Sequence, residues 1–182
     1  NALAAASVAM HLGMSMDEVA SALSDVTAIS PHRMAVSTVH KPETSFTLID
    51  DSFNANPDSM KAGLTDVALE AGAETQPFRI AVLGAMLELG PDEKDLHAGI
   101  GRYAVEGDVD ALLTVGSTSD ASLDALAGAM AEGASAAGCA SHIDWVHDID
   151  EADRLVTQLA VEHPGGVVLL KGSHASGLSA LA

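Results

Sequence analysis

The fold is decided by the segment Leu48-Ile49-Asp50-Asp51-Ser52-Phe53-Asn54-Ala55-Asn56-Pro57. An apolar run that ends in two carboxylates is typical of a buried strand. The pair Asn56-Pro57 then supplies an N-cap residue and a proline at the first position of a helix. That helix is expected to bury one apolar face: Met60, Leu64, Val67 and Ala68. The segment therefore predicts a strand, a short loop and a helix in immediate succession.

The rest of the chain repeats this alternation. Strands are predicted at 38–40, 46–50, 79–84, 111–115, 142–146 and 167–170, with a turn at Lys41-Pro42 between the first two. Pro91 is expected to open a further helix, and two more helices follow. Their expected inward residues are Leu96, Ile100, Tyr103 and Ala104, then Leu123, Leu126, Ala127 and Met130, then Leu155, Val156 and Leu159. Alternating strands and helices predict an α/β fold with a mainly parallel sheet.

Two short helices are predicted before this domain. The first runs from Asn1 to Leu12 and ends at Gly13, and the second begins at Ser15, which forms a capping box with Glu18. The segment 24–33 is interpreted as a linker. A chain that starts inside such a helix is expected to be the tail of something larger.

Composition limits the possible functions. Apolar residues make up 48% of the chain, enough for a core, and no apolar run approaches the roughly 20 residues needed to span a bilayer. The formal charge is −18 with only eight Lys and Arg, which argues against nucleic acid or anionic lipid as a partner. One cysteine, Cys139, and the lack of a basic signal region favour the cytoplasm.

Ligands of such sheets bind at the carboxyl ends of the strands, so polar residues there are the candidates. Asp51 could hold ribose hydroxyls and Asn54 or Asn56 could contact polar groups, or Asp51 and Asn56 could satisfy turn and cap amides. Glu88, between Gly84 and Gly90, could bind an ammonium group. His97 follows in the next helix, where a lone histidine is usually a surface or half-buried residue.

Lys171 ends the last predicted strand. An ammonium at the end of a buried strand needs an anionic partner, either a phosphate or a carboxylate. Gly172 and Ser173 then begin a turn whose amides could help to hold an anion. Arg33 is interpreted either as an exposed linker residue or as a hinge residue that reaches a phosphate when domains close.

Several segments together resemble the Mur ligase family in order and spacing. The matching ones are Asn1-Ala2-Leu3-Ala4-Ala5-Ala6, Pro31-His32-Arg33, the run from Asp50 to Met60, Val82 to Gly90 with His97, and Leu170-Lys171-Gly172-Ser173. The resemblance implies that residues 1–29 are the tail of a central ATPase domain with its linker. Residues 30–182 would then form a Rossmann-like C-terminal domain.

The resemblance also implies a reaction. Such ligases use ATP and Mg²⁺ to activate a carboxylate as an acyl phosphate, which an amine then attacks. The Asn-Ala-Asn-Pro run and the Glu-Leu-Gly loop imply UDP-N-acetylmuramoyl-tripeptide and D-alanyl-D-alanine as substrates. The nucleotide would lie near Asn1, Arg33, Asp51 and Asn54, and the substrates near Glu88, Ser173 and Asn56, with Lys171 and His97 at the reaction centre. Mg²⁺ would be held mainly by the central domain.

No GxxxxGK[ST] phosphate loop occurs in the chain, so by itself it is expected to catalyse nothing. Four positions depart from the family pattern: His32 replaces a glycine, Phe53 a tyrosine, Ala85 an aspartate and His174 an arginine. Three alternatives stay open: a folylpolyglutamate synthase, a glutamate-adding Mur ligase, and a non-catalytic Rossmann-like nucleotide-binding module.

Overall fold

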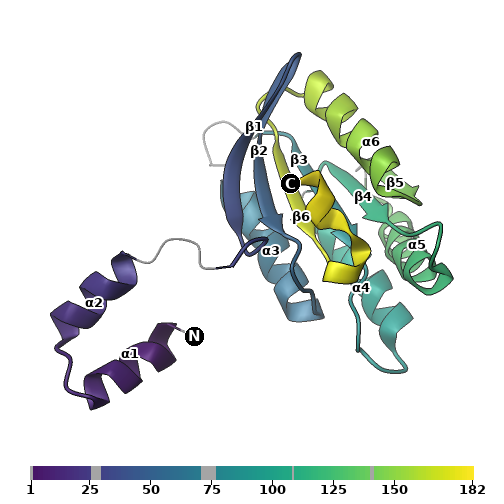
Figure 1. Cartoon of the computed structure of the whole chain (residues 1–182). Coiled ribbons are helices and arrows are strands. Elements are labelled where there is room, and N and C mark those ends of the chain that lie inside the picture. The colour runs from purple at the N-terminus through teal and green to yellow at the C-terminus, as the bar shows by residue number, and fades with distance from the viewer. Residues whose placement is uncertain (1, 26–29, 71–76, 108, 140–141) are drawn as a thin grey trace. The chain divides into compact units, whose positions relative to one another are not determined.

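The chain divides into two units, residues 1–31 and residues 32–182. The first unit consists of two helices. The computed structural model describes residues 2–25, 30–70, 77–107, 109–139 and 142–182 (Figure 1). Helix α1 (Ala2–His11) is followed by α2 (Met16–Ser24). The predicted capping box is confirmed, because the Glu18 amide donates to Ser15 Oγ and the Ser15 amide donates to Glu18 Oε2. Asn1 and residues 26–29 of the predicted linker lie outside the described residues.

The second unit is built on a six-stranded sheet, and all six predicted strands are present. They are β1 (Ala35–Lys41), β2 (Thr44–Asp51), β3 (Arg79–Gly84), β4 (Ala111–Val115), β5 (His142–Val146) and β6 (Val167–Lys171). The order is β1-β2-β6-β3-β4-β5. Strand β1 pairs antiparallel with β2, and the other neighbours are parallel. The predicted fold class is confirmed.

Helices cover both faces of the sheet (Figure 1). On one face, α3 (Pro57–Glu70), α4 (Glu93–Glu106) and α5 (Ala121–Ala136) pack on residues such as Ile49, Leu83 and Leu169. On the other, α6 (Ile149–Glu162) and the short helix η2 (Leu178–Leu181) pack on the alternate residues of the same strands. Strands covered on both sides read as continuous apolar runs, and this makes them visible in the sequence.

The predicted inward faces of α5 and α6 are confirmed, but that of α4 is partly wrong. Leu96 and Tyr103 are 37% and 36% exposed, and the buried stripe is His97, Ile100, Gly101, Ala104 and Val105. Gly101 decides this face, because a β-carbon there would lie 1.9 Å from the Met130 carbonyl oxygen of α5. Pro91 lies in a turn, and α4 begins at Glu93. In α3, Met60 and Leu64 are buried, while the side chains of Val67 and Ala68 lie outside the described part.

The position of β6 brings distant parts of the chain together. It lies between β2 and β3, with Lys171 opposite Asp51 on one side and Leu83 on the other. The carboxyl ends of β2, β6 and β3 are therefore adjacent, and the loops that leave them share one edge of the sheet.

Candidate functional site

Lys171 lies at the centre of this edge and is almost fully buried, with 1% of its surface exposed. Its Nζ forms an ion pair with Asp51 Oδ2 and approaches the Asn54 carbonyl oxygen at 3.4 Å. Of the two partners that the sequence allowed, a phosphate or a carboxylate, the described structure contains the carboxylate. The pair ties the end of β6 to the loop that follows β2.

Asp51 has a second contact at its other oxygen. The Met34 amide donates to Asp51 Oδ1 at 3.3 Å, so the carboxylate is held from both sides. A carboxylate oxygen has two lone pairs, and each oxygen of Asp51 therefore retains the capacity to accept a further hydrogen bond. A ribose hydroxyl is a donor of this kind.

Asp50 organises the segment that enters the domain, a role that the sequence reasoning missed. Its side chain accepts hydrogen bonds from the Ser52 hydroxyl at 2.6 Å and the Ser52 amide at 3.2 Å, and pairs with His32 Nδ1 at 2.6 Å. His32 has φ +58°, a left-handed backbone that favours glycine. A glycine, which the resemblance implies at this position, would adopt this backbone without strain. Here the contact with Asp50 helps to hold the histidine.

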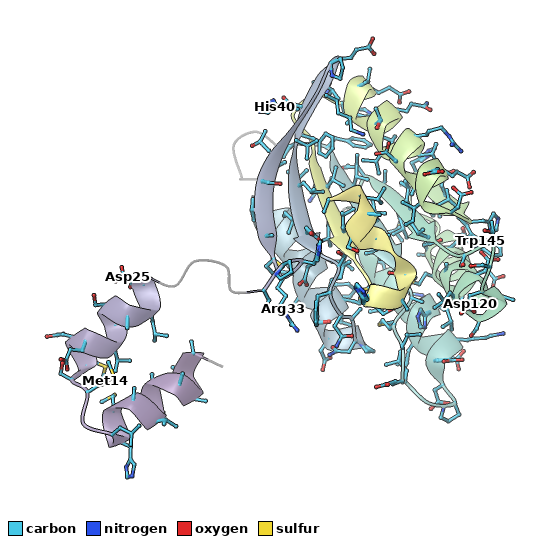
Figure 2. All side chains as sticks on the ribbon, viewed as in Figure 1. Met14, Asp25, Arg33, His40, Asp120 and Trp145 are labelled. Carbon is cyan, nitrogen blue, oxygen red and sulfur yellow. The ribbon has the colours of Figure 1, made fainter. Side chains whose placement is uncertain are left out.

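Arg33 is exposed and lies over an aromatic ring at the same edge. Its guanidinium carbon is 4.0 Å from the centroid of the Phe53 ring, a cation–π arrangement. The Phe53 amide donates to the His32 carbonyl at 3.0 Å, which holds the two loops together. Figure 2 shows Arg33 at the start of β1, far along the strand from His40. The His174 ring lies 6.5 Å from the Phe53 ring.

The two asparagines of the loop have mainly local contacts. The Ser59 amide donates to Asn56 Oδ1 at 2.9 Å, so Asn56 caps α3 as one of its two interpretations proposed. Asn54 Oδ1 accepts from the Ala55 amide at 2.9 Å. Both side chains are exposed at the edge, where a ligand could replace these local bonds.

The loop between β3 and α4 contains an exposed carboxylate and a buried histidine. Glu88 is exposed and has φ +61°. His97 is fully buried, and the expectation of a surface or half-buried histidine is wrong because the ring turns inward with Ile100 and Gly101. Its Nε2 accepts from the Met86 amide at 2.9 Å and its Nδ1 lies 2.6 Å from the Glu93 carbonyl oxygen. Burial lowers the pKa of His97, against a smaller opposing effect of the Glu93 carbonyl.

Ser173 begins the turn after β6. Its hydroxyl is buried and has no hydrogen-bond partner among the residues that the structure describes. Its amide donates to the Ala85 carbonyl at 2.9 Å, which joins this turn to the β3–α4 loop. Ala85 packs with Leu123 and Leu126 of α5, so this position, where the resemblance implies an aspartate, belongs to an apolar cluster.

Most of the residues predicted for the site therefore share one edge. Residues from the segment before β1 and from the carboxyl ends of β2, β3 and β6 with their following loops gather there: Arg33, Asp51, Asn54, Asn56, Glu88, Lys171 and Ser173. His97 lies beneath this edge and not on it, and Asn1 lies outside the described residues. Within the described ranges, no group of three or more His, Cys, Asp or Glu side chains is placed to hold a metal ion. Nor does any described helix have the length and apolar character to cross a membrane.

The chain matches one protein family over most of its length. Residues 32–174 match the family described as Mur ligase, glutamate ligase domain. The UDP-N-acetylmuramoyl-tripeptide--D-alanyl-D-alanine ligase of Mycobacterium leprae is 43% identical, in a match that covers the whole chain and 35% of that protein. The Escherichia coli ligase of the same name is 36% identical over 66% of the chain and 25% of that protein. The chain spans about a third of the length of the curated relatives it matches most fully.

Solved structures agree with the fold. A crystal structure of MurF from Acinetobacter baumannii superposes with a TM-score of 0.77 at 25% identity, over 99% of this chain and 35% of that one. MurF from Thermotoga maritima, solved in complex with ADP, gives a TM-score of 0.58 at 22% identity, which is evidence of the fold alone.

Proposed function

The chain belongs to the Mur ligase family, and on that premise we propose that it is the C-terminal part of an ATP-dependent ligase that joins D-alanyl-D-alanine to UDP-N-acetylmuramoyl-tripeptide. The observation that carries the proposal is the meeting of three loops at the carboxyl ends of β2, β6 and β3. They place the Asp51–Lys171 pair and Glu88 along one edge, and Arg33, from the segment before β1, joins them through its contact with Phe53. The proposal is supported by the mycobacterial UDP-N-acetylmuramoyl-tripeptide--D-alanyl-D-alanine ligases whose matches cover the whole chain.

The residues present suit a nucleotide at the β2 side of the edge. Arg33 is an exposed cation over the Phe53 ring, and the amide of the next residue, Met34, bonds to Asp51. The chain has only eight Lys and Arg, and the guanidinium of Arg33 suits phosphate oxygens. Asp51 can accept from ribose hydroxyls, and the Asn54 amide is exposed beside it. ATP would supply the phosphoryl group that activates the tripeptide carboxylate. We assign Asn1 to the nucleotide as well, and Mg²⁺ mainly to the remainder of the protein.

The residues at the β3 side suit the substrates. Glu88 is exposed and negatively charged, and it is proposed to attract the ammonium group of D-alanyl-D-alanine. The Ser173 hydroxyl, which has no hydrogen-bond partner among the described residues, is proposed to bond to the same dipeptide. Asn56 is proposed as a weaker contact, because capping α3 already occupies its oxygen.

Lys171 is proposed to act at the reaction centre by fixing Asp51 at the end of β2 and Asn54 in the loop that follows. Its ammonium group neutralises Asp51 and contacts the Asn54 carbonyl, so its loss would disturb nucleotide and substrate positions together. Residues 1–29 are proposed to belong to the central ATPase domain. Without a phosphate loop, the 182-residue chain alone is proposed to be inactive, and acceptor-dependent phosphate release by it would contradict that. The cytoplasmic location stays a prediction.

The deciding experiment measures phosphate release by the complete ligase that contains this chain. MgATP and UDP-N-acetylmuramoyl-tripeptide are supplied with D-alanyl-D-alanine, D-glutamate or L-glutamate as the acceptor. Release that depends on the dipeptide supports the proposal. Release only with a glutamate would assign the chain to a glutamate-adding relative. A folded protein that is silent with every acceptor would instead be a nucleotide-binding module, and the proposed reaction would be wrong.

A further inference from the structure

His97 occupies an unusual position for a polar side chain. It is fully buried in α4, yet both of its ring nitrogens have partners. The Glu93 carbonyl can only accept, so Nδ1 carries the proton, and the Met86 amide can only donate, so Nε2 is unprotonated. The ring is therefore neutral and held in one tautomer. A histidine held in this way has no nitrogen left for proton transfer to a substrate.

The Met86 contact is one half of a clamp on a single peptide unit. The Ala85 carbonyl and the Met86 amide belong to the same planar peptide group. The carbonyl accepts from the Ser173 amide at 2.9 Å, and the amide donates to His97 Nε2 at 2.9 Å. This peptide unit is thus fixed from the turn after β6 on one side and from α4 on the other.

The clamp matters because the backbone of the β3–α4 loop, which begins at this peptide unit, is conformationally constrained. Glu88 follows two residues later with φ +61°, and Gly90 has φ +80°. A non-glycine residue in the left-handed region persists only where its surroundings hold it. The residues on either side of the clamp, Ala85 and Met86, are fully buried, so the loop starts from a rigid base.

We infer that His97 is a positioning residue that directs the β3–α4 loop, and with it Glu88, through the amide of Met86. The effect on catalysis rests on the proposed function, in which Glu88 meets the amine of the dipeptide. The effect on the loop does not, because it follows from the contacts of His97 alone. His97 thereby has a different role from the direct one at the reaction centre that the family resemblance implied.

Two substitutions separate the effect of losing the hydrogen bond to Met86 from the effect of losing the imidazole ring. In His97→Gln the side-chain oxygen can reach the place of Nε2 and accept from Met86. In His97→Asn the amide reaches only the place of Nδ1, so the buried Met86 amide loses its acceptor. Arg102→Gln, at an exposed position of the same helix, is the matched control.

The first test uses the 182-residue chain and needs no activity. Long-range ¹⁵N–¹H NMR spectra should show His97 as the Nδ1–H tautomer at neutral pH. Hydrogen exchange of the Met86 amide should be slow in the wild-type chain and in His97→Gln, and at least about tenfold faster in His97→Asn if the variant remains folded. An Nε2–H tautomer, or equal protection of Met86 in the two variants, would overturn the inference.

The second test measures the steady-state constants of the complete ligase. In His97→Asn we expect the KM for D-alanyl-D-alanine to rise by about tenfold, the effect of one lost buried hydrogen bond, with a smaller change in kcat. His97→Gln and Arg102→Gln should stay within about threefold of wild type. An unchanged KM for D-alanyl-D-alanine in folded His97→Asn would refute the inference that His97 affects catalysis through the loop. If the wild-type ligase does not use the dipeptide, the proposed function fails, and the NMR result still decides whether His97 positions the loop.

Discussion

Gly63 of α3 lies directly against the side chain of Lys171. A β-carbon added to Gly63 would come within 2.9 Å of Lys171 Cδ and 3.5 Å of Cε. The lysine stem passes through this space and is fixed at its far end by Asp51. The absence of a side chain at position 63 is therefore what allows a lysine to end a buried strand.

Gly63→Ala should consequently destabilise the protein although alanine favours helix. The helix gain is about 1 kcal/mol, and displacing a buried side chain that is tethered at its tip costs about 1–3 kcal/mol. Denaturant unfolding measures the sum. Gly99→Ala in α4, where an added β-carbon meets nothing within 4 Å, is the control and should stabilise by up to about 1 kcal/mol. Equal stabilisation by both substitutions would show that Lys171 moves freely.

A larger loss is expected where α4 meets α5. A β-carbon on Gly133 would lie 2.0 Å from the Ala98 carbonyl oxygen, and one on Gly101 would lie 1.9 Å from that of Met130. Backbone cannot move aside as a side chain can, so Gly133→Ala should cost about 3 kcal/mol or more. The same unfolding measurement applies, again beside Gly99→Ala. A cost below about 1 kcal/mol would mean that the two helices separate easily.

The Asp51–Lys171 pair should show strong coupling in a double-mutant cycle. Lys171→Met leaves Asp51 without its cation and should destabilise the domain by about 3 kcal/mol. Asp51→Asn with Lys171→Met should cost less than the sum of the single changes, by at least about 1 kcal/mol, because the variants share one interaction. Additivity within about 0.5 kcal/mol would assign the loss to packing of the lysine stem instead.

Stability should depend on pH through His97. Burial lowers the pKa of His97 in the folded state, so the unfolded chain takes up this proton first as the pH falls. The stability that the neutral His97 contributes is fully present above the pKa of histidine in the unfolded chain, about 6.5. It is lost as the pH falls from there toward the lower pKa of His97 in the folded state. The free energy of unfolding should therefore decline less steeply between about pH 6.5 and 5 in His97→Gln than in wild type. His147, whose pKa is raised by its hydrogen bond with Asp124, acts in the opposite sense but is common to both proteins. Parallel pH profiles would contradict this prediction.

Salt should stabilise the chain. Its formal charge of −18 comes from 26 acidic residues against eight Lys and Arg, so the folded state carries strong repulsion between acidic groups. Raising NaCl from about 0.1 M to about 1 M shortens the Debye length from about 10 Å to about 3 Å and screens that repulsion. The thermal midpoint should rise, and a variant with several exposed acidic residues changed to their amides should respond less. A fall in the midpoint with salt would show that ion pairs outweigh the repulsion.

The sequence by itself determined the elements and much of the chemistry. The central strands β3, β4 and β6 were predictable because helices cover both faces of the sheet there, so each of these strands is a nearly continuous apolar run. Asn56-Pro57 and Ser15 mark helix starts through local backbone bonding. The need of Lys171 for an anionic partner also follows from the sequence, since burying an ammonium group without one is costly.

Only the tertiary structure decided which elements are neighbours. The insertion of β6 between β2 and β3 selects Asp51, 120 residues away in the chain, as the partner of Lys171. Close contact through Gly101 turns His97 inward, against the expectation from apolar periodicity, and the backbone of His32 explains a glycine position that the sequence marks only as a departure. Periodicity reports the local geometry of a helix or strand. Partners across the sheet depend on strand order, which local geometry does not specify.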